Sequence, residues 1–361
     1  MIKILQIVPS MRYGGVETVV MNYYRHLDKT NLQLDFGTYT IVDELRSEIE
    51  ANNGKIYFVN NKNKHPLKRF NDVYQLAKCG KYDIVQVHSD SASLFLDLLA
   101  AKIAGTRVRI AHSHNTNCFV KWQHYLLKPF IRFVANEKFA CSDAAGKWMF
   151  GNNPYKVIIN GIDFNKYGFK EKTRKTVRDN LNWKDNVVIG HVGNYQKSKN
   201  QIFLVKMLPA LIAKYPNIKI GFVGTYSDEA KSFVEENTLE QYVDFLGIRK
   251  DVQDVLQGFD LFCFPSLFEG NPSAVTEACA SCLPCIISDQ TFDAMCKINF
   301  NKYFYHLPLD INAWVNKVSE LIDENNKRIP LTAKEIEESG FDINTLGLQL
   351  TKLYEDLGTN K

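Results

Sequence analysis

The feature that most constrains the fold is an alternation of short apolar stretches with longer amphipathic segments, which starts a second time halfway along the chain. In the first half the apolar stretches lie at 2–9, 32–39, 56–59, 82–89 and 107–114, with shorter ones at 138–143 and 156–161. The pattern begins again at 186–193 and continues at 218–225, 260–266 and 283–289. Unbroken Val and Ile runs are typical of strands buried on both faces, and strands that alternate with helices form parallel sheets. We therefore expect an α/β protein with two doubly wound, Rossmann-like domains.

The length of 361 residues agrees with two domains. A polar, lysine-rich stretch at 161–185 is the candidate joint, and we expect an N-terminal domain at 1–164 and a C-terminal domain at 165–340. Apolar residues at helical spacing predict a terminal helix within 341–361, which we expect to pack back on the N-terminal domain. The N-terminus has no signal-peptide pattern, and no apolar run is long enough for a membrane span.

Charge is distributed unevenly between the halves. Residues 1–160 contain 21 Lys and Arg against 13 Asp and Glu, whereas the whole chain contains 44 against 40. This asymmetry indicates an anionic partner for the first half, with chance as the alternative. Neither half combines a platform of aromatic residues with a basic groove, so we do not expect nucleic acid as a partner.

Cysteine spacing gives no metal site. Cys279, Cys282 and Cys285 are evenly spaced, but no histidine or further cysteine completes a zinc pattern, and their neighbours are apolar. We expect buried thiols and no metal. No DxD pair follows a strand, so a metal clamp for a diphosphate is not expected either.

Glycines and polar residues follow several of the predicted strands. Ligands of parallel sheets gather at the carboxyl ends of the strands, and two such sets facing each other would make a cleft between the domains. In the first half they are Gly14, Gly15, His88, Asp90, His112 and His114. In the second half they are Gly193, Asn194, Lys199, Gly224, Glu269 and Gly270.

The stretch FEGNPSAVTEA, residues 268–278, carries two glutamates eight positions apart. Pro272 suits a first helical turn, and a helix that begins near Ser273 would offer free amides to a phosphate group. Glu269 before that helix and Glu277 inside it could then accept hydrogen bonds from hydroxyl pairs on either side of a diphosphate, as in a sugar nucleotide. Lys199 stands at another helix start, where a cation is unfavourable unless an anion is bound. The alternative is a solvated loop glutamate, an ordinary helix glutamate and an exposed lysine.

The histidines allow two interpretations. A lone histidine on a strand is more often structural than functional, and we expect His112 and His114 to point to opposite faces, with only one towards the cleft. The pair Gly14-Gly15 permits close approach of a ligand to the backbone. It lacks the third glycine of a GxGxxG fingerprint, so a nucleotide-dependent dehydrogenase is not favoured.

The sequence FEGNPSAVTEACASCLPCIISD resembles the E-x7-E signature of retaining GT-B glycosyltransferases of family 4, the glycosyl transferases group 1 type. Further segments resemble the other conserved blocks of that family, in the expected order. They are GGVETVVMNYYRHL, DIVQVHSD, RIAHSHNT, CSDAAGKWMFG, VIINGIDFNKY, IGHVGNYQKSKN and FLGIRKDV. The resemblance covers about residues 1–300 and is nearest to bacterial capsule, exopolysaccharide and O-antigen enzymes. It implies a cytoplasmic hexosyltransferase that moves a sugar with retention from a nucleotide-diphosphate donor, a UDP-sugar, without a metal or another cofactor. The implied acceptor is a growing polysaccharide precursor, lipid-linked or an oligosaccharide, carried by the N-terminal domain, while the C-terminal domain binds the nucleotide sugar.

Residue roles follow from the same resemblance. The implied catalytic residues are Glu269 at the donor sugar's hydroxyls, Lys199 at the diphosphate, and His114, with His112 as the rival, near the reacting carbon. Glu277 would contact the ribose. The implied donor-binding set is Gly14, Gly15, Gly193, Asn194, Lys199, Gly224, Ile248, Arg249, Gly270, Asn271, Pro272, Ser273, Ala274 and Glu277. The implied acceptor-side set is His88, Asp90 and His112.

The sequence departs from the family pattern at two positions. Asn194 stands where the family usually has an arginine that clamps phosphate, so one charge is missing unless Lys197 or Arg249 supplies it. Cys282 replaces a small glycine, which we expect to affect packing only. The alternatives to a transferase are a GT-B module that binds a sugar nucleotide without catalysis and a UDP-sugar epimerase of GT-B fold.

Two basic clusters lie in the first half. Residues 119–134 mix aromatic residues with Lys121, Lys128 and Arg132. The second cluster is Lys62, Lys64, Lys68 and Arg69. We expect both to contact the anionic inner face of a membrane or a lipid-diphosphate acceptor, and the alternative for 119–134 is an amphipathic helix that covers the core.

Overall fold

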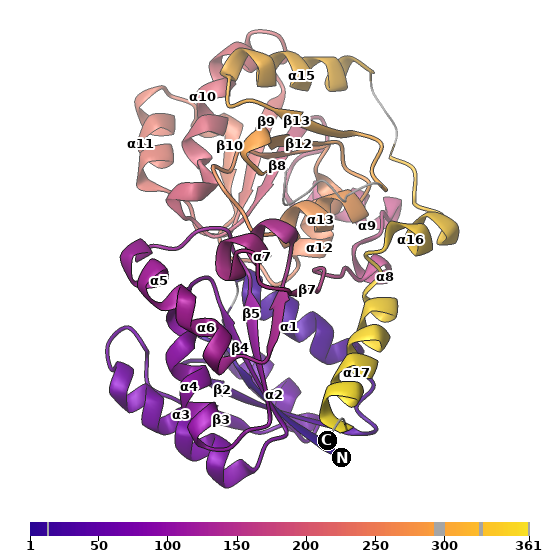
Figure 1. The fold of residues 1–361 in the computed structure, drawn as a ribbon. Helices are drawn as coiled ribbons and strands as arrows, with labels where there is room; N and C mark the ends of the chain where they lie inside the picture. Colours follow the sequence, from indigo (N-terminus) through magenta and orange to yellow (C-terminus); the bar gives the residue numbers. More distant parts are fainter. Residues whose placement is uncertain (13, 292–299, 325–327, 360–361) are drawn as a thin grey trace. The chain divides into compact units, whose positions relative to one another are not determined.

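The computed structural model describes residues 1–12, 14–291, 300–324 and 328–359 and contains two parallel sheets, each with helices on both faces (Figure 1). Contacts divide the chain into unit 1, which is 1–161 with 343–361, and unit 2, which is 162–342. The expected fold class, two doubly wound α/β domains, is confirmed.

Unit 1 contains a seven-stranded sheet in the order β3-β2-β1-β4-β5-β6-β7. Its strands are β1 (Ile2–Ile7), β2 (Leu32–Thr38), β3 (Ile56–Phe58), β4 (Ile84–Ser89), β5 (Val108–Ser113), β6 (Glu137–Ala140) and β7 (Lys156–Val157). Its helices are α1 (Gly15–His26), α2 (Asp43–Ala51), α3 (Pro66–Gly80), η1 (Ala92–Leu94), α4 (Phe95–Ile103), α5 (Lys121–Leu127), η2 (Lys128–Phe130), α6 (Ile131–Val134), α7 (Asp143–Phe150) and α17 (Ile343–Thr359). The strand order reverses between β1 and β4, and this switch point is where a doubly wound sheet binds ligands.

Unit 2 repeats the plan with a six-stranded sheet in the order β10-β9-β8-β11-β12-β13. Its strands are β8 (Val187–Val192), β9 (Ile218–Val223), β10 (Val243–Phe245), β11 (Leu261–Phe264), β12 (Cys285–Ser288) and β13 (Phe304–Leu307). Its helices are α8 (Phe164–Tyr167), α9 (Glu171–Asn180), η3 (Lys197–Lys199), α10 (Gln201–Ile212), α11 (Asp228–Glu236), η4 (Glu240–Tyr242), α12 (Val252–Gly258), α13 (Ser273–Ala280), η5 (Asp289–Thr291), α15 (Ile311–Glu324) and α16 (Ala333–Ser339). The switch point here lies between β8 and β11.

The last helix, α17, belongs to unit 1 and packs on α1 (Figure 1). Its apolar residues Ile343 and Leu350 join Ile4 and Tyr24 in one core cluster of that unit. Gly347 permits the close approach, because a Cβ there would lie 2.5 Å from the carbonyl oxygen of His26 in α1.

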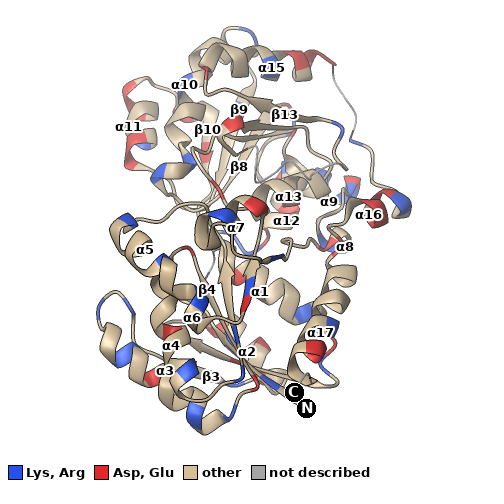
Figure 2. Ribbon diagram, viewed as in Figure 1, with Lys and Arg blue, Asp and Glu red and all other residues tan. Residues whose placement is uncertain are grey.

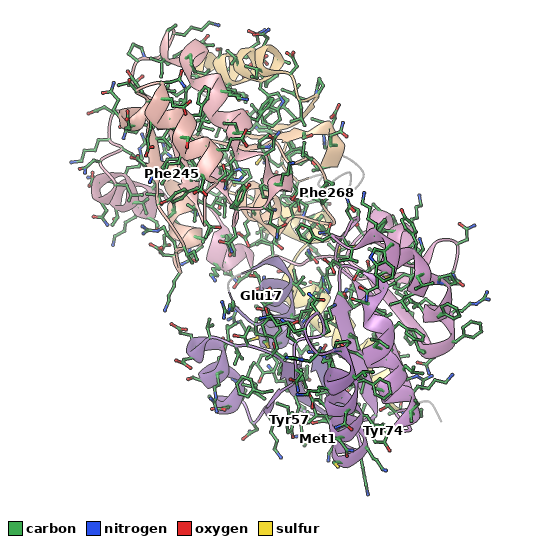
Figure 3. The ribbon with its side chains drawn as sticks, turned by 90° about the vertical axis from the view of Figure 1, so that its left-hand side faces the viewer. Met1, Glu17, Tyr57, Tyr74, Phe245 and Phe268 are labelled. Atoms are coloured by element: carbon green, nitrogen blue, oxygen red, sulfur yellow. The ribbon has the colours of Figure 1, made fainter. Side chains whose placement is uncertain are left out.

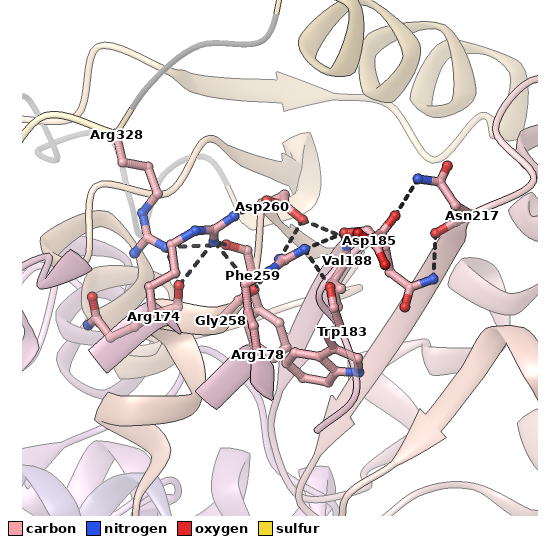
Figure 4. Close-up of polar contacts among 12 residues, drawn as sticks. Arg174, Arg178, Trp183, Asp185, Val188, Asn217, Gly258, Phe259, Asp260 and Arg328 are labelled. Atoms are coloured by element: carbon pink, nitrogen blue, oxygen red, sulfur yellow. Dashed lines mark hydrogen bonds and ion pairs between the residues drawn. The ribbon is translucent and has the colours of Figure 1, made fainter. Parts of the chain in front are cut away.

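A polar network at the amino ends of β8 and β11 fixes the edge of the second sheet opposite its switch point (Figure 4). Asp260, just before β11, pairs with Arg174 at 2.5 Å and with Arg178 at 3.0 Å, both from α9. The same carboxylate accepts from the backbone N–H of Val188 at 2.7 Å. Arg328 reaches the network by donating to the carbonyl of Phe259 at 3.2 Å. One carboxylate therefore aligns two strands and a helix.

In unit 1 a buried ion pair joins α3 to α4. Arg69 donates twice to the Asp97 carboxylate, at 3.0 Å each, and the two side chains are 2% and 4% exposed. We expect Asp97→Asn to lower the free energy of unfolding by about 3 kcal/mol, because it leaves a buried guanidinium without a counter-charge. Urea unfolding measures this, with Glu50→Gln as the control. Glu50 pairs with Arg46 on the surface of α2, and we expect that change to cost less than about 0.5 kcal/mol. Equal effects of the two variants would contradict the prediction.

The expectation that Arg69 contributes to a basic surface is wrong, because Asp97 holds it inside the unit, whereas Lys64 and Lys68 are exposed. Strand β13 and helix α15 were not expected from the sequence. The short strand Phe304–Leu307 has no long apolar run to mark it. Of the eight cysteines, Cys296 lies outside the described residues.

Candidate functional site

In unit 2 the loops that follow β8 and β11 bring Lys199 and Glu269 together. Lys199 Nζ lies 2.8 Å from Glu269 Oε1, and the side chains are 16% and 12% exposed. The ammonium also lies 4.7 Å from the centre of the Phe264 ring at the end of β11. The 3-10 turn η3 presents Lys199 just before α10, and its Ser198 carbonyl accepts from Leu267 N–H at 2.8 Å. Two residues 70 positions apart therefore form one partly buried ion pair at the switch point.

The glycines expected to bind the donor lie where neighbouring loops touch. Gly193 N–H donates to Val223 O at 2.9 Å, and Gly224 N–H donates to Gly247 O at 2.8 Å. At Gly224 φ is +109°, and a Cβ would lie 2.5 Å from the carbonyl oxygen of Gly193. A side chain at 224 would thus force apart the loops that follow β8 and β9.

Asn194, the departure from the family pattern, has a structural contact. Its Oδ1 accepts from Thr225 N–H at 3.3 Å, which joins the same two loops. Of the two residues considered as replacements for the missing charge, Arg249 is paired with Asp251 at 2.6 Å, and Lys197 is exposed. Ile248, beside Arg249, is 55% exposed.

Helix α13 begins at Ser273, as predicted, with Pro272 as its N-cap residue. Ser273 and Ala274 form the first turn, after buried Gly270 and half-buried Asn271. Phe268, labelled in Figure 3, opens this loop next to Glu269. The N-terminal amides of α13 consequently follow directly on the loop that carries the ion pair.

Glu277 lies in the second turn of α13 and is buried, at 6% exposure. Burial raises the pKa of this carboxyl to about 7, against the opposing effects of a hydrogen bond with Tyr167 and the charge of Lys166. A carboxyl that titrates near neutrality can both accept and donate a hydrogen bond at neutral pH.

His191 is a feature of this site that the sequence analysis missed, although it belongs to the quoted block IGHVGNYQKSKN. Its ring is buried and stacks on Phe264, and Nδ1 donates to Cys263 O at 3.0 Å. Nε2 is buried without a hydrogen-bond partner among the described residues, 3.9 Å from where a Cβ of Gly193 would lie. Burial lowers the pKa of His191 to about 4, with a smaller contribution from Lys199.

In unit 1 three histidines cluster at the carboxyl ends of β4 and β5. His88 Nδ1 lies 2.8 Å from His114 Nε2, and the rings of His112 and His114 are 4.1 Å apart. The expectation that His112 and His114 point to opposite faces is wrong, because residues two positions apart on a strand share a face. Both residues considered for the same role therefore lie in one cluster.

All three imidazoles are neutral. Burial lowers the pKa of His114 to about 3 and holds those of His88 and His112 well below 6.5. In the part of the chain that the structure describes, these histidines are also the one group whose spacing could hold a metal ion, with ligand atoms within 4.8 Å of one another. Bound metal would displace the hydrogen bond between His88 and His114.

The glycine pair lies at the start of α1, with Gly14 as the N-cap residue. A Cβ at Gly15 would meet nothing within 4 Å, whereas one at Gly14 would lie 2.9 Å from the Glu17 carboxylate. Figure 3 shows Glu17, whose pKa is raised by burial and whose Oε1 accepts from Arg12 N–H at 3.2 Å. The backbone at Gly15 is thus open to a ligand.

Asp90 follows β4, and its carbonyl accepts from Trp148 Nε1 at 3.0 Å. Lys62 donates to the hydroxyls of Ser89 at 3.1 Å and Ser93 at 2.8 Å. Burial lowers the pKa of Lys62, and the charge of Asp90 opposes this. Unit 1 therefore holds a largely enclosed cation beside its switch point, which the sequence suggested only as part of a surface cluster.

Comparisons with known proteins assign each unit to a glycosyltransferase family model. The family model Glycosyltransferase Family 4 matches residues 13–166, and Glycosyl transferases group 1 matches 173–336. EpsF of Bacillus subtilis (strain 168), named as a glycosyltransferase, is 34% identical over 311 residues, 80% of this chain and 79% of EpsF. The capsular polysaccharide biosynthesis glycosyltransferase CapH of Staphylococcus aureus is 25% identical over 98% of this chain and 99% of CapH.

Solved structures agree on the fold. Anabaena Alr3699/HepE in complex with UDP and glucose superposes with a TM-score of 0.83 at 19% identity, over 98% of this chain and 100% of that one. TarM superposes with a TM-score of 0.71 at 12% identity, over 100% of this chain and 99% of that one. These are GT-B neighbours, and the chain therefore belongs to the GT-B glycosyltransferases of the group 1 and family 4 type, with relatives in capsule and exopolysaccharide synthesis.

Proposed function

We propose that this glycosyltransferase moves a hexose from a UDP-sugar, with retention and without a metal, to a lipid-linked saccharide. The observation that carries the proposal is the Lys199–Glu269 pair, because Glu269 lies in the loop that leads to the first amides of α13. A cation and backbone amides neutralise charge on a leaving diphosphate, and a carboxylate holds sugar hydroxyls.

Two relatives support a lipid-linked acceptor. One, from Escherichia coli, is named as a UDP-Gal:alpha-D-GlcNAc-diphosphoundecaprenol alpha-1,3-galactosyltransferase and is 25% identical over 82% of this chain. Another, from Campylobacter jejuni, is named for transfer to a diphospho-undecaprenol substrate and is 24% identical over 76%. UDP as the nucleotide is supported by its presence in the HepE complexes.

The mechanism we propose is a front-face displacement. The oxygen of the departing diphosphate helps to remove the proton of the acceptor hydroxyl, while Lys199 and the amides of α13 hold the charge that develops. His114 contacts the donor sugar near its reacting carbon. The raised pKa of Glu277 suits a carboxyl that faces the two hydroxyls of a ribose.

The test is transfer from a panel of UDP-hexoses to a polyprenyl-diphosphate saccharide in the presence of EDTA. Product with the anomeric configuration of the donor supports the proposal, whereas inversion or a requirement for a divalent ion overturns those parts of it. A thermal-shift screen identifies the donor, since a ligand at a hundredfold its Kd adds about 2.7 kcal/mol to the unfolding free energy.

We also propose that residues 119–134, the amphipathic segment, bind an anionic membrane surface. No helix among the described residues combines the length and the apolarity of a membrane span. The segment nevertheless exposes large apolar side chains, and Figure 2 shows basic residues along the same helices. They are Phe119 (92% exposed), Val120 (46%), Trp122 (70%), Tyr125 (58%), Leu126 (59%), Phe130 (47%) and Phe133 (54%). Apolar side chains interleaved with Lys and Arg are typical of interfacial helices.

Within the amphipathic segment, His124 is buried and attaches the helix to the rest of unit 1. Its ring stacks on Trp148 with ring centres 4.0 Å apart, and its Nδ1 accepts from Ala92 N–H at 3.1 Å. We expect the double variant Phe119→Ala, Trp122→Ala to weaken flotation with vesicles containing anionic lipid by about tenfold or more. Phe58→Ala is the matched control, because Phe58 is 61% exposed outside the segment. Equal binding to neutral and anionic vesicles would contradict the membrane proposal.

A further inference from the structure

A continuous chain of side-chain hydrogen bonds runs from His114 through the C-terminal helix to His112. His114 Nε2 lies 2.8 Å from His88 Nδ1, and His88 Nε2 lies 2.7 Å from Gln6 Oε1. Gln6 Nε2 donates to the Tyr354 hydroxyl at 3.2 Å, which donates to Gln86 Oε1 at 2.7 Å. Gln86 Nε2 then meets His112 Nδ1 at 2.9 Å. Tyr354 belongs to α17, at the far end of the sequence from Gln6 in β1.

The protons in this chain are correlated. Each hydrogen bond holds one proton, so the chain can run in one direction or in full reverse, and the amide orientations of the two glutamines select the direction. With Gln6 Oε1 facing His88, His88 carries its proton on Nε2 and accepts at Nδ1. His114 must then carry its proton on Nε2, which leaves its Nδ1 as an acceptor. His112, which accepts from Gln86, likewise carries its proton on Nε2.

Burial makes the correlation strict. Gln6, Gln86, His88, His112 and Tyr354 are each at most 4% exposed, so bulk solvent does not reach these side chains. The depressed pKa values of the three histidines keep each ring neutral, with one donor and one acceptor. In such surroundings a broken link leaves a polar group unpaired, which is costlier than the bond itself was stabilising.

We propose that Tyr354 is a positioning residue for sugar transfer: through Gln6 and His88 its hydroxyl fixes the ring orientation and the tautomer of His114. This rests on the proposed function, in which His114 contacts the donor sugar. In that tautomer the Nδ1 lone pair of His114 is the group offered to a hydroxyl of the substrate. The consequence is that α17 completes the catalytic face of unit 1 as well as its core.

The first test is Tyr354→Phe, which removes one hydroxyl and keeps the ring. We expect kcat to fall about tenfold while KM for the UDP-sugar stays within about twofold, because the change acts on an oriented group and not on donor binding. The matched control is Tyr23→Phe. Tyr23 is also buried in unit 1, but its hydroxyl donates to the carbonyl of Ile159 at 2.5 Å and takes no part in the series of hydrogen bonds from His114 to His112. A control that loses as much kcat as Tyr354→Phe would overturn the proposal.

The second readout is the imidazole ¹⁵N spectrum of the whole protein, which is independent of activity. We expect His114 and His88 as pure Nε2–H tautomers in the wild-type protein and in Tyr23→Phe, and as tautomer mixtures in Tyr354→Phe. An Nδ1–H tautomer of His114 in the wild-type protein, or unchanged spectra in Tyr354→Phe, would overturn the proposal. If the spectra behave as expected but His114→Ala transfers sugar at the wild-type rate, the proposed catalytic role of His114 is wrong, whereas the control of its tautomer by Tyr354 is supported.

Gln6→Glu covers the case in which Tyr354→Phe does not fold. A carboxylate at position 6 would accept from His88 Nε2–H and stabilise its imidazolium, so the pKa of His88 rises. We expect transfer by this variant to decline on acidification at a higher pH than in the wild-type enzyme. An unchanged pH profile would contradict the coupling between Gln6 and the histidines.

Discussion

Lys199→Ala and Glu269→Ala are each expected to lower the rate of sugar transfer by about a hundredfold or more, while both units stay folded. In the proposed function, removing Lys199 takes away the cation that neutralises the leaving diphosphate. In the same proposal, removing Glu269 takes away the acceptor for the donor sugar's hydroxyls. The pair is only 16% and 12% exposed, so water is a poor substitute for either group.

The ion pair also predicts how the two changes combine. Each single change leaves the opposite charge partly buried without its partner, so part of each effect is the loss of that partner. We therefore expect Lys199→Ala, Glu269→Ala to be less damaging than the product of the single effects, because residues in contact are not independent. The measurement is kcat/KM for UDP-sugar transfer, with circular dichroism to establish folding.

Matched controls are available in the same unit. Lys206→Ala in α10 and Glu236→Ala in α11 remove exposed charges, and we expect transfer within about twofold of the wild-type rate. Wild-type rates in Lys199→Ala and Glu269→Ala would end the assignment of the donor site.

The second large effect is acid destabilisation of unit 1. His114 and His124 have folded pKa values of about 3 and about 4, lowered chiefly by burial from 6.5. Below pH 6.5 the unfolded chain binds protons that the folded unit does not, so the free energy of unfolding falls as the pH falls. Between pH 7 and pH 5 each of the two contributes a loss of about 2 kcal/mol. His88 and His112 are shifted in the same direction and add to the loss, whereas Glu17, whose pKa is raised by burial, opposes it.

Unit 2 is expected to respond much less. His191, with its pKa lowered to about 4, contributes a similar loss of about 2 kcal/mol. The opposite sign applies to Glu277, whose pKa is raised to about 7. Its folded carboxyl takes up a proton as the pH falls through 7, whereas the unfolded one does so only near 4.5, so unit 2 gains about 2 kcal/mol between pH 7 and pH 5. These two contributions are similar in size and opposite in sign, and His306, whose pKa burial also lowers, adds a loss in the same direction as His191.

Hydrogen exchange read by peptide mass spectrometry distinguishes the units. At pH 5, corrected for the intrinsic exchange rate, β4 and β5 should lose protection while β8 and β9 keep it. His191→Phe is the control, because it removes the opposing titration and should make unit 2 more protected at pH 5 than at pH 7. Equal loss of protection in both units would contradict this account.

The sequence predicted the fold class well, because its signal is local. Buried parallel strands such as β1 and β4 are continuous apolar runs, and the helices between them have their own periodicity. β13 was missed because four residues bounded by polar neighbours carry little periodicity. The start of α13 was predicted at Ser273, because Pro272 directly before it is a local signal for the beginning of a helix.

The candidate site was predictable in composition but not in its pairings. The sequence indicated that Lys199 and Glu269 follow strands, but their ion pair depends on the order in which β8 and β11 neighbour each other. The expectation of opposite faces for His112 and His114 was wrong because side chains on a strand return to the same face every two residues. In the structure the centres of the two rings are 4.1 Å apart. Tyr354 had no local signal at all, since its partners Gln6 and Gln86 lie far away in the sequence.

The return of α17 to unit 1 has a consequence for synthesis of the protein. Unit 1 is split in the sequence by unit 2, so its core stays incomplete until α17 has been synthesised, whereas unit 2 is contiguous and can fold earlier. A product truncated before α17 would lack Tyr354, so under the proposed role of this tyrosine an incomplete enzyme would not consume sugar nucleotide.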